Sequence, residues 1–370
     1  MLFTRLIFVF LSTVSLLTTV SASVPKKYRV GITAHDIHDE WWAIIHHVLF
    51  MYDTIEHSET WEPVLLMHAD TSGVVDIRGK MYRAAPMDTC VHTLVIGSSR
   101  SIQSNLRACP DTHVVYFNQG PTYFQTHTNL LDNTYTKRPR IDTVWTTPQY
   151  NWQASFVKEI MGASASFPAP YVWDPRISTH RFTPVIPGST NRSTNRVGVY
   201  ETNRGIYKMS LMPMLIVEKA HREKPLAHAE AYGLGRLDTD AFRKHVLSGF
   251  EAPWKTSKSM AKLPQQWNAE RIGTVVSHTL RNGLNYLWLE ALHSGLALVH
   301  NSEHMPEGCG YYYPGENITA GAEALQRAVE THDAAEAERQ RQKCLWPFST
   351  SNPVNVEWYE RLLDETLTGQ

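Results

Sequence analysis

Apolar runs of four to six residues alternate with longer stretches of helical periodicity through the first half of the chain. The short runs predict buried strands, because consecutive apolar residues bounded by turn residues leave no solvent-facing side. The longer stretches repeat apolar residues every three or four positions, which is typical of helices that pack on a sheet. The expected strands are residues 28–32, 64–67, 93–97, 114–117 and 142–145, and the expected helices are 41–55 and 152–161. This alternation predicts a parallel sheet with helices on both faces.

The pattern stops between residues 168 and 195, where Pro, Ser, Thr, Gly and Asn accumulate as in a linker. Beyond it the alternation resumes. The expected strands there are 196–200, 271–276, 296–300 and 311–313, and the expected helices are 211–222, 240–247, 285–293, 319–331 and 356–367. The sequence therefore predicts an α/β protein with two facing doubly wound, Rossmann-like domains. We expect these domains at residues 25–170 and 196–345, with a linker at 171–195 and a helical tail at 346–370.

Residues 1–22 differ from the rest of the chain. They hold a long apolar run, one charged residue, Arg5, and small residues where a signal peptidase would cleave. We predict a cleaved signal peptide, and the alternative is an uncleaved anchor that holds the rest in the lumen. Both predictions place the protein in the secretory pathway, in the ER or Golgi lumen, anchored or secreted. Sequons at Asn191 and Asn317 are compatible with a glycoprotein of that compartment.

Charge and composition narrow the class of protein. A chain of 370 residues is long enough for two domains, each with its own core. Its 42% hydrophobic and 19% charged residues are typical of a packed globular protein. The 35 basic and 36 acidic residues give a net charge of −1, and Lys and Arg form no block. Because a nucleic-acid binder would show a basic face, we expect no nucleic-acid partner.

The four cysteines fall as one pair in each predicted domain, Cys90 with Cys109 and Cys309 with Cys344. An oxidising lumen would permit a disulfide within each pair. Four separate buried thiols are the alternative. No spacing is Cys-x-x-Cys, so the cysteines predict no zinc site.

The stretch from residue 282 to 302 carries the most specific chemistry. It consists of a turn with Gly283, a helix, a glycine cap at Gly295 and an apolar strand. Gly283 frees the backbone so that the helix N-terminus, which carries partial positive charge, can face an anion. Glu290 lies on the same helix, where its carboxylate can accept hydrogen bonds from a pair of ribose hydroxyls. Since open α/β sheets bind ligands beyond the carboxyl ends of their strands, a nucleotide site is expected here.

This stretch resembles the donor-binding motif of GT-B glycosyltransferases, particularly the retaining type with a Glu-x7-Glu pattern. Glu290 matches the second Glu of that pattern, which holds the nucleotide ribose, and Ala291, Gly295 and the apolar strand match the run that follows it. Asn282 stands in the place of the first Glu, which contacts the donor sugar. An amide can still bind a sugar hydroxyl but cannot act as a carboxylate. The replacement of the first Glu by Asn282 therefore puts the retaining reaction in question, whereas donor binding is expected to remain.

The C-terminal half also resembles a set of uncharacterised GT-B-like proteins. The shared features are residues 200–203, 213–218, 300–302 and 310–314, together with Lys208, Asn285 and Tyr286. The resemblance implies that a basic residue after the first strand of this domain lies against the diphosphate, and the candidates are Arg204 and Lys208. It also implies a donor site that contains Asn282, Gly283, Asn285, Tyr286 and Glu290. The alternatives are a solvated surface lysine at Lys208 and a partly exposed helix carboxylate at Glu290.

In the N-terminal half, a polar cluster at residues 35–40 follows the first strand. GT-B acceptor domains often supply a base or a sugar contact from this position, so His35 and Asp36 are the catalytic candidates. An imidazole or carboxylate there would take a proton from an acceptor hydroxyl. The alternative is that Asp36 or Asp39 caps the following helix. Only His35 and His38 are spaced for a metal ion, and no metal site is predicted.

These features predict a hexosyl- or pentosyltransferase that moves a sugar from a nucleotide diphosphate to a hydroxyl of a glycan or glycoconjugate. The nucleotide sugar is the donor substrate, and no cofactor is expected because protein cations and a helix dipole would stabilise the leaving group. The expected partners are the nucleotide sugar, the acceptor and, if residues 1–22 are retained, a membrane. The alternatives are a non-catalytic sugar-binding or scaffold protein of the same fold, and an epimerase or phosphorylase.

Overall fold

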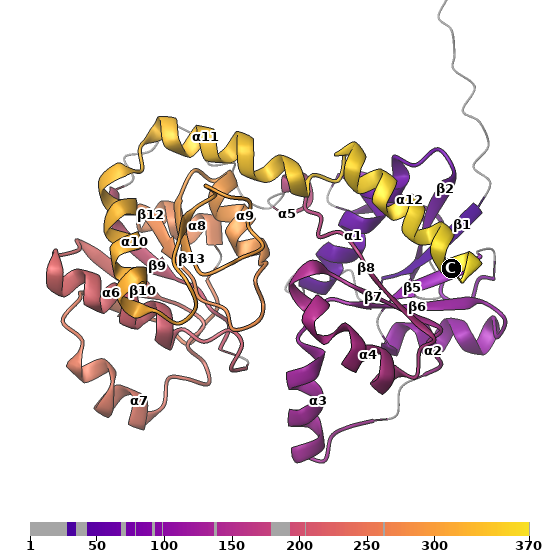
Figure 1. The fold of residues 1–370 in the computed structure, drawn as a ribbon, viewed down its shortest axis with the longest axis horizontal. Helices are drawn as coiled ribbons and strands as arrows, with labels where there is room; N and C mark the ends of the chain where they lie inside the picture. Colours follow the sequence, from indigo (N-terminus) through magenta and orange to yellow (C-terminus); the bar gives the residue numbers. More distant parts are fainter. Residues whose placement is uncertain are drawn as a thin grey trace, which may run out of the picture.

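The computed structural model describes residues 28–34, 43–67, 72–77, 79–90, 93–97, 99–136, 139–178, 193–203, 205–261 and 263–369. Two sheets, each surrounded by helices, lie side by side along the longest axis of the molecule (Figure 1). The predicted fold class, an α/β protein of two doubly wound domains, is confirmed.

The N-terminal sheet has the strand order β3-β4-β2-β1-β5-β6-β7-β8. Its strands are β1 (Tyr28–Thr33), β2 (Trp61–Met67), β3 (Gly73–Ile77), β4 (Lys80–Pro86), β5 (Leu94–Gly97), β6 (His113–Asn118), β7 (Thr143–Thr146) and β8 (Ala165–Pro168). Neighbouring strands are parallel, except that β3 and β4 form an antiparallel hairpin at the edge. The carboxyl ends of β1 and β5 to β8 therefore share one edge of the sheet.

Both faces of this sheet are buried. Alternate residues of its strands enter different cores: Ile96 packs with Phe50 of helix α1, whereas Val95 packs with Val157 of helix α4. The helices of this domain are α1 (Ala43–Glu56), α2 (Ser99–Ala108), α3 (Thr122–Leu131), the 3₁₀ helix η1 (Pro148–Gln153), α4 (Ala154–Met161) and α5 (Pro175–Ser178). The helix expected at 152–161 begins only at Ala154, because Pro148 starts a separate 3₁₀ turn before it.

The C-terminal sheet is entirely parallel, in the order β11-β10-β9-β12-β13-β14. Its strands are β9 (Ser193–Val199), β10 (His228–Ala231), β11 (Trp254–Thr256), β12 (Ile272–Val276), β13 (Ala297–His300) and β14 (Tyr311–Tyr312). Its helices are α6 (Leu211–Glu223), α7 (Asp240–His245), η2 (Leu247–Gly249), α8 (Leu263–Ala269), α9 (Tyr286–His293), α10 (Ile318–Thr331), α11 (Ala334–Leu345) and η3 (Trp346–Phe348).

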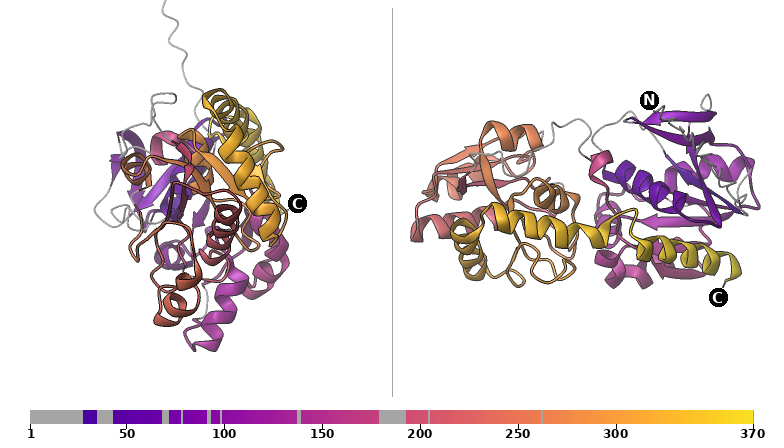
Figure 2. Two further views of the ribbon diagram at one scale, coloured as in Figure 1. Left: turned by 90° about the vertical axis from the view of Figure 1, so that its left-hand side faces the viewer. Right: turned by 90° about the horizontal axis from the view of Figure 1, so that it is seen from above.

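The last helix, α12 (Pro353–Thr368), leaves the C-terminal domain and packs on the N-terminal one (Figure 2). Trp145 Nε1 of β7 donates a hydrogen bond of 3.0 Å to Thr366 Oγ1, and Trp61 Nε1 of β2 donates one of 3.1 Å to Asp364 Oδ1. Tyr359 is buried and its hydroxyl donates to the carbonyl of Pro170 at 3.3 Å. The chain therefore passes between the domains twice, once before the C-terminal domain in the sequence and once after it.

Each domain contains one disulfide. Cys90 bonds Cys109, and Cys309 bonds Cys344 of α11, so both pairs that the sequence permits are formed. Two disulfides are typical of proteins that fold in an oxidising compartment. Among the described helices, none combines the length and the apolar character that crossing a bilayer requires. The predicted signal segment, residues 1–22, lies outside the described residues.

Candidate functional site

The two domains meet through loops that follow their strands. On the C-terminal side these are the loop after β9 and the turn between β12 and α9, and Leu280 N joins the two by donating to Tyr207 O at 3.0 Å. Across the domain boundary, Tyr150 OH of η1 donates to Asn282 Oδ1 at 2.5 Å, and Trp152 Nε1 donates to Arg281 O at 3.2 Å. The candidate site lies where these loops face the N-terminal domain.

Asn203 shapes the loop after β9. Its φ of 51° lies in the left-handed region, which Asn tolerates better than most residues. Its side-chain amide donates to Glu201 O, Ser210 Oγ and Gly233 O, and its Oδ1 accepts from Ser210 N at 2.8 Å. The backbone N–H of Asn203 also donates to Lys208 O at 3.1 Å. A single buried amide thus holds the loop that presents Lys208.

Glu201 connects this loop to the rest of the C-terminal edge. Its buried carboxylate accepts a hydrogen bond from the Ser277 hydroxyl at the end of β12, and Ser277 Oγ accepts one from Trp288 Nε1 of α9 at 2.7 Å. Burial raises the pKa of Glu201, while the Ser277 hydrogen bond and the charge of Lys208 oppose that shift. The network holds β9, β12 and α9 in one arrangement.

Lys208 is the cation that this edge offers to a ligand. Its side chain is partly buried, and burial lowers its pKa while the charge of Glu201 raises it. It forms no ion pair with any described residue. Across the boundary lies His47 of α1, whose pKa is lowered to about 3 by burial and then by the charges of His46 and Lys208. A partly buried ammonium that forms no ion pair in the described part of the chain, and feels only the nearby charge of Glu201, favours an anionic ligand.

Asn282 and Gly283 lie between β12 and α9. Asn282 is 1% exposed, and its Oδ1 accepts from Tyr150 whereas its Nδ2 has no hydrogen-bond partner in the described part of the chain. Gly283 is required by close packing, because a Cβ there would lie 2.6 Å from Cδ2 of His304. The Gly283 carbonyl accepts from the Ser302 hydroxyl. The turn is thus held firmly while the Asn282 amide nitrogen is left unsatisfied.

The other predicted donor-site residues lie on or next to α9. Asn285 is its N-cap and accepts from Leu287 N at 3.3 Å. Tyr286 is buried, with its hydroxyl hydrogen-bonded to His47 Nδ1 and its ring 5.0 Å from that of Tyr171. Glu290 is partly buried one turn further along, and it adds to the raised pKa of Tyr286, which burial chiefly causes. As predicted, Gly295 follows the helix, with a left-handed φ of 71°.

The structure therefore brings Lys208, Asn282, Gly283, Asn285 and Tyr286 to one edge, with Glu290 behind them on α9. His35, Asp36 and Arg204 lie outside the described residues. Sequence reasoning missed Tyr150 and His47 as contacts of this edge. Tyr150 carries no motif of its own, and His47 was one of many dispersed histidines. Only the fold places them opposite residues more than one hundred positions away.

One group of potential metal ligands occurs in the described part of the chain, His228, Glu230 and Glu270. It lies near the amino ends of β10 and β12, away from the candidate site. Its carboxylates already have partners: Glu230 accepts from Gln266 Nε2 at 3.0 Å and from Tyr200, and Glu270 pairs with Lys255. The group is an internal polar network.

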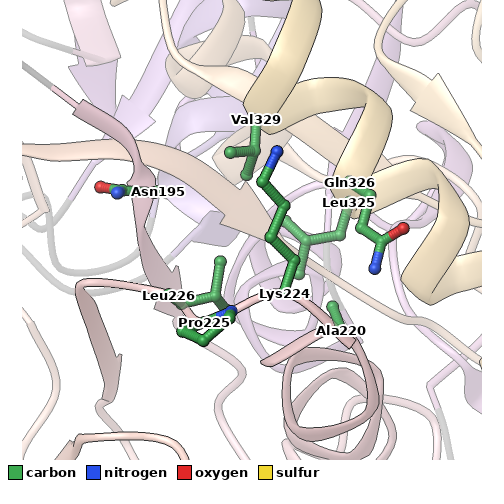
Figure 3. Close-up of a pocket in the computed structure, with 8 residues that line it drawn as sticks. All are labelled: Asn195, Ala220, Lys224, Pro225, Leu226, Leu325, Gln326 and Val329. Atoms are coloured by element: carbon green, nitrogen blue, oxygen red, sulfur yellow. The ribbon is translucent and has the colours of Figure 1, made fainter. Parts of the chain in front are cut away.

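A small pocket opens between α6 and α10 of the C-terminal domain (Figure 3). It encloses about 60 Å³, far less than the several hundred Å³ of a nucleotide-sized site. Its lining is Asn195, Ala220, Lys224, Pro225, Leu226, Leu325, Gln326 and Val329. Asn195 and Leu226 lie near the amino ends of β9 and β10, and Lys224 pairs with Glu330 at 3.0 Å. This pocket is therefore separate from the candidate site.

Comparison with solved structures identifies the fold as GT-B, which confirms the predicted architecture. The chain resembles an alpha-glucosyltransferase (AGT) in complex with UDP, with a TM-score of 0.55, 12% identity, and 92% of this chain and 100% of the other covered. It resembles sucrose-phosphate synthase from Thermosynechococcus elongatus with a TM-score of 0.54, 11% identity and coverage of 93% and 100%. At these identities the likeness shows the fold alone.

A third similar structure is that of TarM from S. aureus, with a TM-score of 0.50 and 14% identity. The match covers 73% of this chain but only 55% of TarM, so the chain spans about half the length of that protein. None of the curated proteins matches the chain in sequence.

A family model covers nearly the whole chain, across both domains and into α12. The match runs from residue 30 to residue 363. The chain belongs to the family described as "Protein of unknown function (DUF2827)".

Proposed function

We propose that this protein is a glycosyltransferase that moves a sugar from a nucleotide-diphosphate sugar to a hydroxyl of a glycan or glycoconjugate. The observation that carries the proposal is Lys208, a partly buried cation that has no ion-pair partner among the described residues and lies beside the loop leading into α9. A diphosphate would supply the missing charge. It would also restore the ordinary pKa of the lysine, which burial lowers.

In this proposal the diphosphate, the ribose and the sugar of the donor each contact a different part of the C-terminal edge. The diphosphate lies against Lys208 and the positive end of α9, with Arg204 as a second cation. Glu290 accepts hydrogen bonds from the ribose hydroxyls. The unpartnered Nδ2 of Asn282 donates to a hydroxyl of the donor sugar. This hydrogen bond replaces the one that a carboxylate makes in the Glu-x7-Glu type.

The reaction itself needs a stabilised leaving group and a base. Lys208 and the α9 dipole stabilise the charge that develops on the departing diphosphate, so no cofactor or metal is proposed. His35 and Asp36 follow β1, and in this proposal they take the proton of the acceptor hydroxyl. The acceptor domain is the N-terminal one, and nucleic acid is not among the proposed acceptors.

The comparisons supply a first nucleotide to test. Structures of this fold include AGT in complex with UDP and HepE of Anabaena in complex with UDP-glucose, which has a TM-score of 0.50 and 14% identity. We further propose that the protein works in the lumen of the secretory pathway, anchored or secreted. Asn317, which is exposed at the start of α10, is then open to glycosylation.

The test is titration calorimetry with UDP on the purified protein, paired with a transfer assay. Lys208→Met should weaken UDP binding at least tenfold, because it removes a hydrogen bond and charge worth about 1.5–3 kcal/mol. Glu290→Gln should cost a similar amount. Lys219→Met, on the outer face of α6 where Lys219 pairs with Glu223, is the control and should leave binding unchanged. Equal UDP affinity in the wild type and the Lys208 variant would contradict the proposal.

A further inference from the structure

Two described segments of the N-terminal domain near the candidate site contain no Asp, Glu, Lys or Arg. The first segment, residues 118–131, begins at the last residue of β6, and the second, residues 143–157, begins with β7. At the chain average of 19% charged residues, 29 positions would hold five or six. Most of their side chains are amides, hydroxyls or aromatic rings, with one histidine, His127. Such a surface offers neutral hydrogen bonds and ring faces and no charge.

Several buried polar atoms of these segments have no hydrogen-bond partner among the described residues. They are Asn118 Nδ2, Thr146 Oγ1, Thr147 Oγ1 and Gln149 Oε1, in side chains that are at most 2% exposed. Asn118 and Thr146 are register partners at the carboxyl ends of β6 and β7. Gln149 precedes Tyr150, which bonds Asn282 of the other domain. Buried polar groups are rarely left unpaired, so unpaired donors and acceptors in one place indicate a missing partner such as a ligand hydroxyl.

Aromatic rings line the same boundary and remain exposed. Trp152 is 41% exposed and Tyr123 is 37% exposed, with ring centroids 5.7 Å apart. Trp152 Nε1 donates to Arg281 O at 3.2 Å, which holds the indole at the domain boundary. Phe124 lies between them and the C-terminal domain, 5.9 Å from Trp152 and 6.4 Å from Tyr207. Several exposed rings gathered in one place, unlike a single exposed ring, are typical of a ligand-binding surface.

We propose that this surface binds the acceptor and that the acceptor is a neutral saccharide. The inference rests on the proposed transferase function and names its substrate class. The C–H faces of a pyranose ring pack on Trp152 and Tyr123, while hydroxyls meet the uncharged amide and hydroxyl groups beside them. A phosphate, sulfate or carboxylate would lose water there without gaining a charged partner. The cations of the site, Lys208 and Arg281, belong to the opposite domain.

The test uses calorimetry on the purified protein, with UDP present and absent. The probes are the neutral trisaccharides maltotriose, cellotriose, chitotriose and mannotriose, and the anionic trigalacturonate. At least one neutral probe should bind, and trigalacturonate should not. Trp152→Ala and Tyr123→Ala should each weaken neutral binding at least tenfold. Trp152→Phe keeps a ring but removes the N–H donor to Arg281, and it should lose less than threefold.

Trp346→Ala is the matched control, because Trp346 is 54% exposed on η3 outside the two uncharged segments. It should bind saccharide like the wild type. The inference is overturned if Trp152→Ala and Tyr123→Ala bind saccharide normally, if only trigalacturonate binds, or if no neutral probe binds at millimolar concentration. UDP binding tells the two proposals apart. If the protein binds UDP but no neutral saccharide, only the proposed acceptor class is wrong. If it binds a neutral saccharide but not UDP, the proposed transferase function is wrong and the saccharide-binding surface stands.

Discussion

The two edges that meet at the domain boundary are built in opposite ways. The C-terminal edge is charged and partly bonded internally: Asn203 and Glu201 lie in a network of hydrogen bonds, whereas the ammonium of Lys208 forms no ion pair with a described residue. The described segments of the N-terminal edge, residues 118–131 and 143–157, contain no Asp, Glu, Lys or Arg, and several of their buried polar atoms, such as Thr146 Oγ1, have no partner among the described residues.

This contrast suggests separate roles for the two edges, a rigid arrangement at the C-terminal one and selectivity for a ligand at the N-terminal one. An edge that holds a diphosphate has to present its cation and helix terminus in one fixed arrangement, and hydrogen bonds inside the protein supply that order. An edge that receives hydroxyls, as we propose for the N-terminal one, has to keep donors and acceptors available, and its described segments contain several unpaired polar atoms. If this division is right, substitutions at the two edges will have different effects on stability and on binding.

The largest effect is expected at Asn203. Asn203→Ala removes four side-chain hydrogen bonds and leaves alanine at a φ of 51°. The free energy of unfolding should fall by roughly 3 kcal/mol, and UDP binding should weaken because Lys208 is no longer held. Urea unfolding measures the first and calorimetry the second. Asn151→Ala, at an exposed position of η1, is the control, with a loss under about 0.5 kcal/mol. A loss at Asn203 no greater than that of the control would contradict an ordered C-terminal edge.

A pH dependence is expected from His47, which lies between the edges. Its folded pKa is about 3, below the usual 6.5, so the unfolded state binds a proton that the folded state does not. Stability should therefore fall as the pH drops from 6.5 toward 3, by about 1.4 kcal/mol per unit from this group. Urea unfolding of the wild type and of His47→Phe between pH 7 and pH 4.5 measures the difference. Identical slopes in the two proteins would show that His47 is protonated in the folded state.

A smaller effect is expected at Asn282, where the two edges touch. Asn282→Ala should weaken binding of UDP-glucose by about 0.5–1.5 kcal/mol, the range for a neutral hydrogen bond, and leave UDP nearly unaffected. Calorimetry with both ligands makes the comparison. Tyr150→Phe is the companion variant: it removes the hydrogen bond to Asn282 Oδ1 but keeps the amide in place. Equal weakening of both ligands by Asn282→Ala would mean that the residue only shapes the turn.

The smallest effect on stability is expected at Thr146. Thr146→Val replaces a buried hydroxyl that has no described partner by a methyl group of the same size. The free energy of unfolding should stay within about 0.5 kcal/mol of the wild type or rise, because no hydrogen bond is lost. Saccharide binding should nevertheless weaken. A loss of more than 1 kcal/mol on urea unfolding would show that the hydroxyl is already satisfied in the free protein.

Local pattern was sufficient for much of the fold. The alternation of apolar runs and helical periodicity predicted both parallel sheets, because strand and helix periods are properties of neighbouring residues. It failed for the β3–β4 hairpin and for β10, where His228 and Glu230 interrupt the apolar pattern although Glu230 is fully buried. Helix α11 was also missed, since its exposed faces are rich in charged residues. These elements are stabilised by packing against distant parts of the chain, which a short stretch of sequence does not show.

Local sequence was enough to predict the residues of the proposed donor site. The turn at Gly283, the cap at Asn285, the carboxylate at Glu290 and the glycine at Gly295 lie within fourteen consecutive residues, and local backbone geometry brings them together. The residues that face them are brought there by the packing of distant parts of the chain. Tyr150 reaches Asn282 across 132 positions and Trp145 reaches Thr366 across 221, because two sheets and a returning helix must pack before those atoms meet. Contacts between residues so far apart depend on the path of the whole chain, and a short sequence motif contains no information about that path.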